Sequence, residues 1–307
     1  MGNIRKITKA MQMVAAAKMK RAVASALSSR LYAEYSWDIL SSISRNVENI
    51  EHPLFVERET KRVLLVVITS NRGLCGAYNT QVSKQAVRFL ESIRRKFPSA
   101  EFEILTAGKK GERLFRRMSE KIAASFLNLP DNVSLRDILP ISRLIAEEYE
   151  KGTYDRAIVA YTDFVSSLVQ RPLIKQIAPI SKRELKEFLR TIGEEKNKIE
   201  LQNGNGDQEE KGRPFAPKID YLFEGEQNAL IGSLAEKLLR MQIYQMFLES
   251  RASEQSARML AMKNATEAAG EMIEDFSLVF NKARQAGITR EISEISAGMV
   301  SVNNLQG

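Results

Sequence analysis

Residues 226–298 read EQNALIGSLAEKLLRMQIYQMFLESRASEQSARMLAMKNATEAAGEMIEDFSLVFNKARQAGITREISEISAG. The stretch contains no proline, since the last proline of the chain is Pro217, and its apolar residues recur at helical spacing. These apolar positions are Ile231, Leu234, Leu238, Met241, Met259, Met262, Ile273, Phe276, Phe280, Ile288, Ile292 and Ile295. One helix over this stretch would be roughly 110 Å long, which is far longer than a compact domain needs. We therefore expect it to run beside a partner helix for most of its length.

The first segment of the chain supplies that partner. Residues 3–49 contain neither proline nor glycine, and the helix-favouring residues Ala, Met, Lys and Arg, together with Ser, dominate them. We predict one helix of about 45 residues, roughly 70 Å long, that ends before His52 and Pro53. The alanines at positions 15–17 would let a second helix approach closely. The two terminal helices should pair as an antiparallel coiled coil, although the apolar register is too irregular for a sustained heptad repeat.

The middle of the chain changes from helical periodicity to short apolar runs. Residues 63–69 form a continuous β-branched run that is typical of a strand buried on both faces. A helical stretch follows at 78–96, and the remaining expected elements are a strand at 101–106, helices at 108–118 and 135–150, and strands at 155–162 and 173–180. This alternation predicts a Rossmann-like α/β domain with a largely parallel sheet.

The predicted fold is therefore an α/β protein with a long antiparallel coiled coil of N- and C-terminal helices. We assign residues 1–52 to the N-terminal coiled-coil helix, 60–217 to the Rossmann-like domain and 220–307 to the C-terminal coiled-coil helix. Residues 193–213 are rich in Glu, Lys, Asn and Gly, a composition that predicts a polar insertion within the α/β domain.

Composition limits the kinds of function that the chain can have. The net charge of +8 permits nucleic acid, an anionic membrane surface or acidic proteins as partners. One cysteine and one histidine allow neither an intrachain disulfide nor a Cys/His zinc cluster. The sequence has neither an apolar run long enough for a transmembrane helix nor a signal-peptide start. We expect a soluble intracellular protein that binds no metal.

Residues 70–76, SNRGLCG, lie between a strand and a helix, where α/β folds bind phosphates. They match neither GxGxxG nor GxxxxGK[ST], and the basic stretch GKKG at 108–111 does not match either. A tight structural turn is the favoured interpretation, and a nucleotide-binding α/β enzyme with a helical arm is the alternative. Cys75 would lie near a helix N-terminus, a position that activates thiols. Because the single histidine, His52, belongs to another segment, we do not expect a Cys–His catalytic pair.

The basic N-terminal helix raises the possibility of a nucleic-acid-binding coiled coil. It carries Arg5, Lys6, Lys9, Lys18, Lys20, Arg21 and Arg30. No aromatic residue is interleaved before Tyr32, and the helix-turn-helix pattern is absent. A solvated or protein-facing basic surface is the favoured interpretation.

Parts of the last helix lack a clean division into an apolar and a polar face. Residues 250–266 and 281–292 mix small, polar and methionine side chains all around the helix. Small residues and methionines suit a surface that meets several neighbours. We interpret these two stretches as contact surfaces.

Four blocks of sequence, in order, resemble the gamma subunit of F-type ATP synthase. They are IRKITKAM at 4–11 running on to AKM at 17–19, SNRGLCG at 70–76, ARM at 257–259 with NAT at 264–266, and NKARQA at 281–286 with IT at 288–289. The resemblance implies the central rotor shaft of the CF(1) or F1 sector, a peripheral protein of ATP synthesis and hydrogen ion transport. Such a shaft couples ion flow to catalysis on the beta subunits by rotation, and it has no catalytic site or cofactor of its own.

The resemblance also implies partners and contact residues. The partners are the alpha and beta subunits of the hexameric ring, the epsilon subunit and the membrane c-ring, with no nucleic acid and no direct nucleotide binding. The residues that match positions of beta-subunit contact or coupling are Met19, Arg258, Arg284, Gln285, Thr289, Glu291 and Glu294. Arg284 and Gln285 resemble the pair that hydrogen-bonds a loop of the beta subunit. The implied location is the cytoplasmic face of the bacterial plasma membrane.

Three features depart from the family pattern. The chain begins where the family's first helix is already under way, and residues 299–307 extend slightly past the usual end. The polar insertion lies where photosynthetic relatives carry a regulatory cysteine pair, and it contains no cysteine. Thiol switching is therefore not expected.

Overall fold

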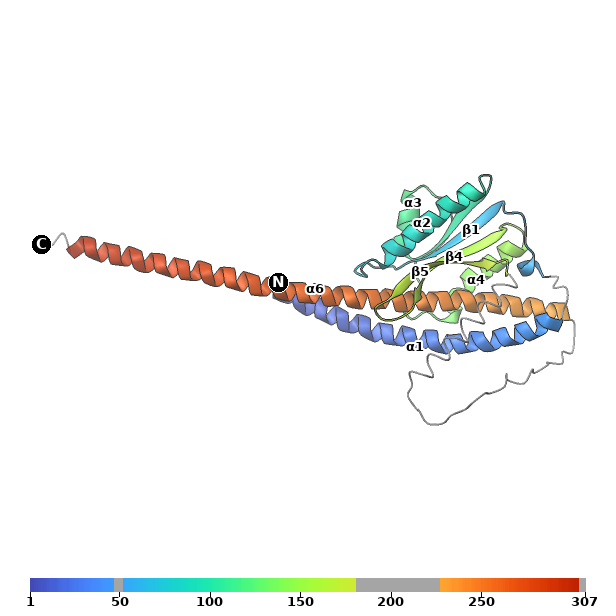
Figure 1. Cartoon of the computed structure of the whole chain (residues 1–307), viewed down its shortest axis with the longest axis horizontal. Helices are drawn as coiled ribbons and strands as arrows, with labels where there is room; N and C mark the ends of the chain where they lie inside the picture. Colours follow the sequence, from blue (N-terminus) through green and yellow to red (C-terminus); the bar gives the residue numbers. More distant parts are fainter. Residues whose placement is uncertain (47–51, 181–226, 304–307) are drawn as a thin grey trace, which may run out of the picture.

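A computed structural model describes residues 1–46, 52–180 and 227–303 of the chain (Figure 1). The two terminal helices, α1 (Gly2–Asn46) and α6 (Gln227–Asn303), lie side by side and run in opposite directions. One link between them is the hydrogen bond from Thr266 Oγ1 to Thr8 Oγ1, 2.8 Å long. The expected antiparallel pair of long helices is confirmed. The predicted insertion at 193–213 lies outside the described residues, and the assigned domain boundaries stay a prediction.

The helix α6 extends beyond its partner. Met1 and Gly2 lie in a shallow groove with Ile273, Phe276 and Phe280 of α6. From there α6 continues alone to its C-terminal end, and its residues 281–295 are exposed all around (Figure 1). Over the described residues, α1 therefore lies along most of the length of α6, and the C-terminal turns of α6 extend past α1.

The α/β domain lies against one side of α6 and is built on a five-stranded sheet. The strands are β1 (Arg62–Ile68), β2 (Glu101–Ala107), β3 (Ile122–Phe126), β4 (Arg156–Phe164) and β5 (Gln170–Ala178), in the order β3-β2-β1-β4-β5. The first four are mutually parallel, and β5 pairs with β4 antiparallel. The largely parallel sheet is confirmed. Sequence analysis missed β3, a short alanine-containing strand at the sheet edge whose side chains are partly buried or exposed.

Helices cover both faces of the sheet. The elements are η1 (Pro53–Phe55), α2 (Tyr78–Lys96), α3 (Lys109–Arg117) and α4 (Leu135–Glu150). Alternation along β1 divides the core: Val63, Leu65 and Val67 pack with residues of α2, whereas Leu64, Val66 and Ile68 pack with residues of α4 and α6. The long helix is therefore at once half of the coiled coil and a layer of the α/β domain.

Local sequence explains why α4 begins where it does. The Ser134 backbone N–H donates to Asp137 Oδ2 at 2.8 Å, and the Ser134 hydroxyl donates to the same oxygen at 2.6 Å. These two hydrogen bonds lower the pKa of Asp137, so the carboxylate is charged at the helix start, where negative charge is stabilising.

In the described parts of the chain, no helix is both long and apolar enough to cross a bilayer. The His, Cys, Asp and Glu side chains of these parts form no group of three or more that could hold a metal ion.

Candidate functional site

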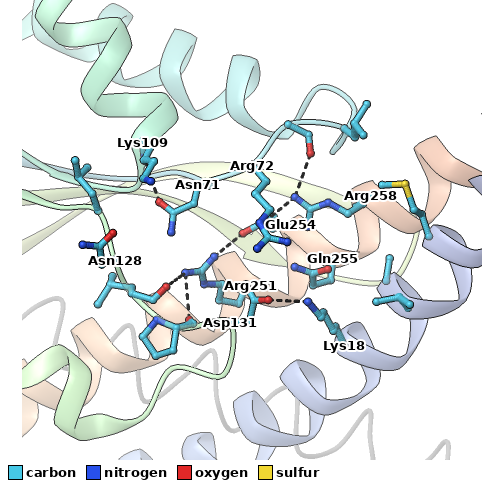
Figure 2. Close-up of a pocket in the computed structure, with 18 of the residues that line it drawn as sticks. Lys18, Asn71, Arg72, Lys109, Asn128, Asp131, Arg251, Glu254, Gln255 and Arg258 are labelled. Atoms are coloured by element: carbon cyan, nitrogen blue, oxygen red, sulfur yellow. Dashed lines mark hydrogen bonds and ion pairs between the residues drawn. The ribbon is translucent and has the colours of Figure 1, made fainter. Parts of the chain in front are cut away.

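Three of the four blocks found in the sequence meet at one place, where α1, the loop at 70–76 and α6 enclose a half-open groove of about 830 Å³ (Figure 2). Lys18 and apolar residues of α1 form one wall, and the loops and α6 contribute charged and amide side chains together with Leu74, Leu127, Leu129 and Pro130. The labelled members are Lys18, Asn71, Arg72, Lys109, Asn128, Asp131, Arg251, Glu254, Gln255 and Arg258. The region where α6, α1 and the α/β domain meet is called the joint below. It includes residues 245–258 of α6.

The loop at 70–76 is held by hydrogen bonds of its own side chains and of Asn79 in the first turn of α2. Asn79 Nδ2 donates to Ser70 Oγ at 2.8 Å and to Cys75 Sγ at 3.1 Å, and the Ser70 hydroxyl donates to the Arg72 carbonyl at 2.6 Å. Cys75 is 2% exposed, so its thiol is part of the internal packing of the loop. His52 lies elsewhere and caps η1 by accepting a hydrogen bond from the Leu54 N–H. The two residues considered for a catalytic pair thus have separate structural roles.

The first amides of α3 are occupied by protein acceptors. The Lys109 N–H donates to Asn71 Oδ1, the Lys110 N–H to the Ser70 carbonyl and the Gly111 N–H to Thr69 Oγ1. A phosphate site at this helix N-terminus would need such donors free. The arrangement favours the structural turn over the nucleotide-binding alternative.

Close approach of two chain segments explains the glycine before α3. Gly108 has φ +112°, and a Cβ at this position would lie 2.2 Å from the Thr69 carbonyl oxygen. Both the backbone conformation and the space require glycine. The basic stretch at 108–111 therefore reflects packing of α3 on the end of β1.

At the centre of the joint, Glu254 lies between two guanidinium groups. Glu254 Oε2 accepts from Arg251 Nη1 at 2.8 Å, and Oε1 accepts from Arg258 Nη2 at 2.9 Å. The three side chains are between 4% and 12% exposed, so these ion pairs are largely shielded from solvent. The spare donors reach backbone carbonyls: Arg258 donates to Gly73, and Arg251 donates to Leu129 and Pro130. Glu254 thereby links α6 to two loops of the α/β domain.

Serines of α6 complete the backbone hydrogen bonding of β4. Pairing of β4 with β1 ends at Ala160, which leaves the later groups on that side of β4 without a strand partner. Ser250 Oγ accepts from the Thr162 N–H at 3.2 Å, and the Ser253 hydroxyl donates to the Thr162 carbonyl at 3.3 Å. One turn further, the Ser256 hydroxyl donates to the Ser167 carbonyl at 2.5 Å. The long helix thus takes the place of a neighbouring strand at the end of β4.

A salt bridge ties α1 into the same region. Lys18 Nζ lies 2.6 Å from Asp131 Oδ2, and this ammonium holds the pKa of Asp131 below its usual value. Asp131 follows the two carbonyls that Arg251 binds. The segment at 129–131 therefore contacts both helices of the coiled coil.

Tyr78, at the start of α2, is buried against this polar surface. Burial, reinforced by the negative charge of Glu254, raises the pKa of Tyr78 far above its usual range. The hydroxyl therefore stays protonated.

The seven residues proposed for partner contact fall into two places. Arg258 lies in the joint, and Met19 is partly buried on α1 nearby. The other five lie on the exposed end of α6: Arg284, Gln285, Thr289, Glu291 and Glu294. In this free end the Thr289 hydroxyl donates only to the Gln285 carbonyl of its own helix, 2.9 Å away.

Sequence analysis missed most of the joint. Among the residues of α6 whose side chains the structure describes, the buried polar ones are Gln245, Glu249, Ser250, Arg251, Ser253, Glu254, Gln255 and Ser256. The mixed polarity of residues 250–266 predicts a contact surface, and for 250–256 the structure shows that one neighbour is the chain's own α/β domain. Ser250, Ser253 and Ser256 bind backbone groups of that domain.

Comparison with known proteins relates the chain to ATP synthases. The family model described as ATP synthase matches residues 1–302. The ATP synthase gamma chain of Legionella pneumophila (strain Corby) is 34% identical over 298 residues, which cover 97% of this chain and 94% of that protein. The ATP synthase gamma chain of Dehalococcoides mccartyi (strain CBDB1) is 34% identical over 302 residues, covering 98% and 94%.

Solved structures agree with this relationship. A chain from the central stalk and c-ring of the Tetrahymena thermophila mitochondrial ATP synthase has a TM-score of 0.56 and 25% identity, and the match covers 85% of this chain and 99% of that one. A chain from the rotor of the Euglena gracilis mitochondrial ATP synthase has a TM-score of 0.58 and 21% identity, with 94% of each chain covered. The second likeness concerns the fold alone.

Proposed function

Because the chain belongs to the ATP synthase gamma chain family, we propose that it is the central-stalk rotor subunit of an F-type ATP synthase. In this role it couples ion flow through the membrane sector to ATP synthesis or hydrolysis at the catalytic sites of the beta subunits. Rotation is the coupling step, and the chain contributes no catalytic site of its own. It is a peripheral subunit at the cytoplasmic face of the bacterial plasma membrane.

The main structural support for the proposal is the free end of α6, which extends from the part of the helix that is packed in the α/β domain. This end projects past α1 and exposes apolar side chains at helical spacing: Ile288 at 49%, Ile292 at 59% and Ile295 at 62% (Figure 1). An exposed apolar stripe of this kind marks a surface that a partner covers. At its other end the same helix is embedded in the α/β domain through the joint.

This arrangement suits a shaft that turns within a ring of alternating alpha and beta subunits. A single helix end has different side chains on each side, so each catalytic subunit of the ring meets a different face. Differential contacts of this kind bias each subunit toward a different nucleotide affinity, and rotation exchanges those affinities in turn. We assign Arg284, Gln285, Thr289, Glu291 and Glu294 to these contacts, with Met19 and Arg258 at the base. The α/β domain then faces the epsilon subunit and the c-ring.

Purification of the complex tests the proposal. An affinity tag on the beta subunit is used to isolate the enzyme from detergent-solubilised native membranes, and mass spectrometry identifies the bound chains. We expect this chain to co-purify with the alpha, beta and epsilon subunits and the c-ring. Its absence from an ATPase-active preparation would contradict the proposal.

A further inference from the structure

Arg251 and Arg258 are seven residues apart on α6, which places them two turns apart on one face with Glu254 between them. Arg251 holds one oxygen of the Glu254 carboxylate and Arg258 is bound to the other. Rotation of this carboxylate would break the geometry of both contacts. The orientation of Arg258 therefore depends on Arg251, although the two arginines share no hydrogen bond with each other among those of the described residues (Figure 2).

Arg251 also connects α6 to a segment that α1 binds. Its Nη2 lies 3.5 Å from the Leu129 carbonyl oxygen and 3.4 Å from that of Pro130. The next residue, Asp131, binds Lys18 of α1. One guanidinium thus contacts the two structural units that must turn together, the coiled coil and the α/β domain.

The charge balance of the cluster means that either arginine can be removed without leaving a buried charge unpaired. Two guanidiniums share one carboxylate, so loss of Arg251 leaves the neutral pair of Glu254 and Arg258. Loss of Glu254 would instead leave two shielded cations without a carboxylate, which is strongly destabilising. The carbonyl of Pro130 belongs to an exposed residue, so water can replace the lost donor there.

We propose that Arg251 is a positioning residue for torque transfer: it fixes Glu254 so that Arg258 stays bound to the loop at 70–76, and it holds the segment at 129–131 against α6. This proposal rests on the rotor function proposed above. Without Arg251, the α/β domain can twist relative to α6 under load. Ion flow and ATP hydrolysis then become less tightly coupled, while the complex still assembles.

The test uses the complete ATP synthase in inverted membrane vesicles carrying Arg251→Met, which retains the length of the side chain. ATP-driven proton pumping and ATP hydrolysis are measured on the same vesicles, and both are normalised to the amount of assembled complex. We expect the ratio of pumping to hydrolysis to fall by about 2- to 30-fold, the range that corresponds to typical effects of substitutions within a coupled network. Arg251→Lys, which keeps a cation next to Glu254, should restore much of the ratio.

The matched control is Arg95→Met, which removes an exposed arginine of α2 that donates to the Glu91 carbonyl of its own helix. Its ratio should equal that of the wild type. The proposal would be overturned if Arg251→Met had the wild-type ratio of pumping to hydrolysis, whatever the yield of complex. A residue with only a structural role would lower the yield and leave this ratio unchanged. A lysine variant no better coupled than the methionine variant would overturn it as well. Failure of the rotor assignment would appear separately, as absence of this chain from the wild-type complex.

Discussion

Arg258 on α6 donates a hydrogen bond to the carbonyl oxygen of Gly73, 3.3 Å away and 185 residues earlier in the chain. The contact joins two of the sequence blocks that resemble the gamma subunit family, one on the long helix and one in the loop after β1. Arg258 in turn depends on Glu254, which is the only carboxylate that pairs with it among the described residues. Two sequence blocks that resemble the family therefore meet at a contact between the long helix and the α/β domain. Because Glu254 binds the arginine that makes this contact, Glu254 is the first residue to test.

Replacing Glu254 with Gln should strongly destabilise the folded chain. The substitution leaves Arg251 and Arg258 shielded from solvent without a counter-charge. We expect the free energy of unfolding to fall by about 3–5 kcal/mol, the usual cost of breaking a buried ion pair from one side. Urea unfolding followed by circular dichroism measures the change. Glu267→Gln is the control, because its pair with Lys263 is exposed and should contribute less than about 1 kcal/mol.

Replacing Ser253 with Ala tests whether α6 completes the hydrogen bonding of β4. Ser253 is fully buried, and its hydroxyl is a donor to the Thr162 carbonyl. An unsatisfied buried carbonyl costs about 1–3 kcal/mol, which thermal or urea unfolding of the purified chain would detect. Ser277→Ala removes a serine of the same helix that bonds only to its own turn on an exposed surface. Equal stability of the two variants would contradict the assigned role of Ser253.

The link between Lys18 and Asp131 should depend on acid pH. Because the ammonium of Lys18 lowers the pKa of Asp131 below its usual 3.8, the carboxylate binds protons more weakly in the folded state than in the unfolded one. Its contribution to stability is therefore fully present above the unfolded-state pKa and is lost as the pH falls through the lower folded-state value.

The measurement is the free energy of unfolding of the wild type and of Lys18→Met at a series of pH values on either side of this range. The difference between the two proteins should be largest near neutral pH and should shrink toward the acid end. A difference that does not change with pH would show that Asp131 is not the titrating partner. The effect should be small, since both side chains are substantially exposed.

The sequence reveals the coiled coil and the sheet because their signals are local. The apolar run of β1 and the limits of α2 and α4 follow from β-branched content, helical periodicity and capping. The strand β3 lacks such a signal, since Ala123 is exposed, Ala124 is only partly buried, and its pairing with β2 is a long-range contact.

The joint could not be predicted for a related reason. Arg251, Ser253 and Glu254 look like surface residues because polar side chains are usually exposed. Arg251 and Ser253 are buried where the backbone carbonyls of Leu129, 122 residues away, and Thr162, 91 residues away, accept their hydrogen bonds. Glu254 is buried where it accepts hydrogen bonds from Arg251 and Arg258. Only the folded chain brings these acceptors to the helix.

At the free end of α6, reversal of charge at Arg284 should weaken coupling without preventing assembly. Arg284 is exposed and lies outside the joint, so Arg284→Glu leaves the packing of the chain intact. We expect complex of normal composition that hydrolyses ATP but shows reduced ATP-driven proton pumping. Unchanged pumping would count against the assigned contact with the beta subunit.

Rotation of this chain against the catalytic ring is the decisive property of a rotor subunit, and it can be observed directly. The alpha–beta ring with this chain is fixed to a surface, and a bead is attached through Arg88→Cys, an exposed position on α2; Cys75 is buried and should not compete for the label. We predict that ATP drives the bead in one direction, in steps that follow the symmetry of the ring. ATP hydrolysis by the same particles with a bead that stays fixed relative to the ring would contradict it.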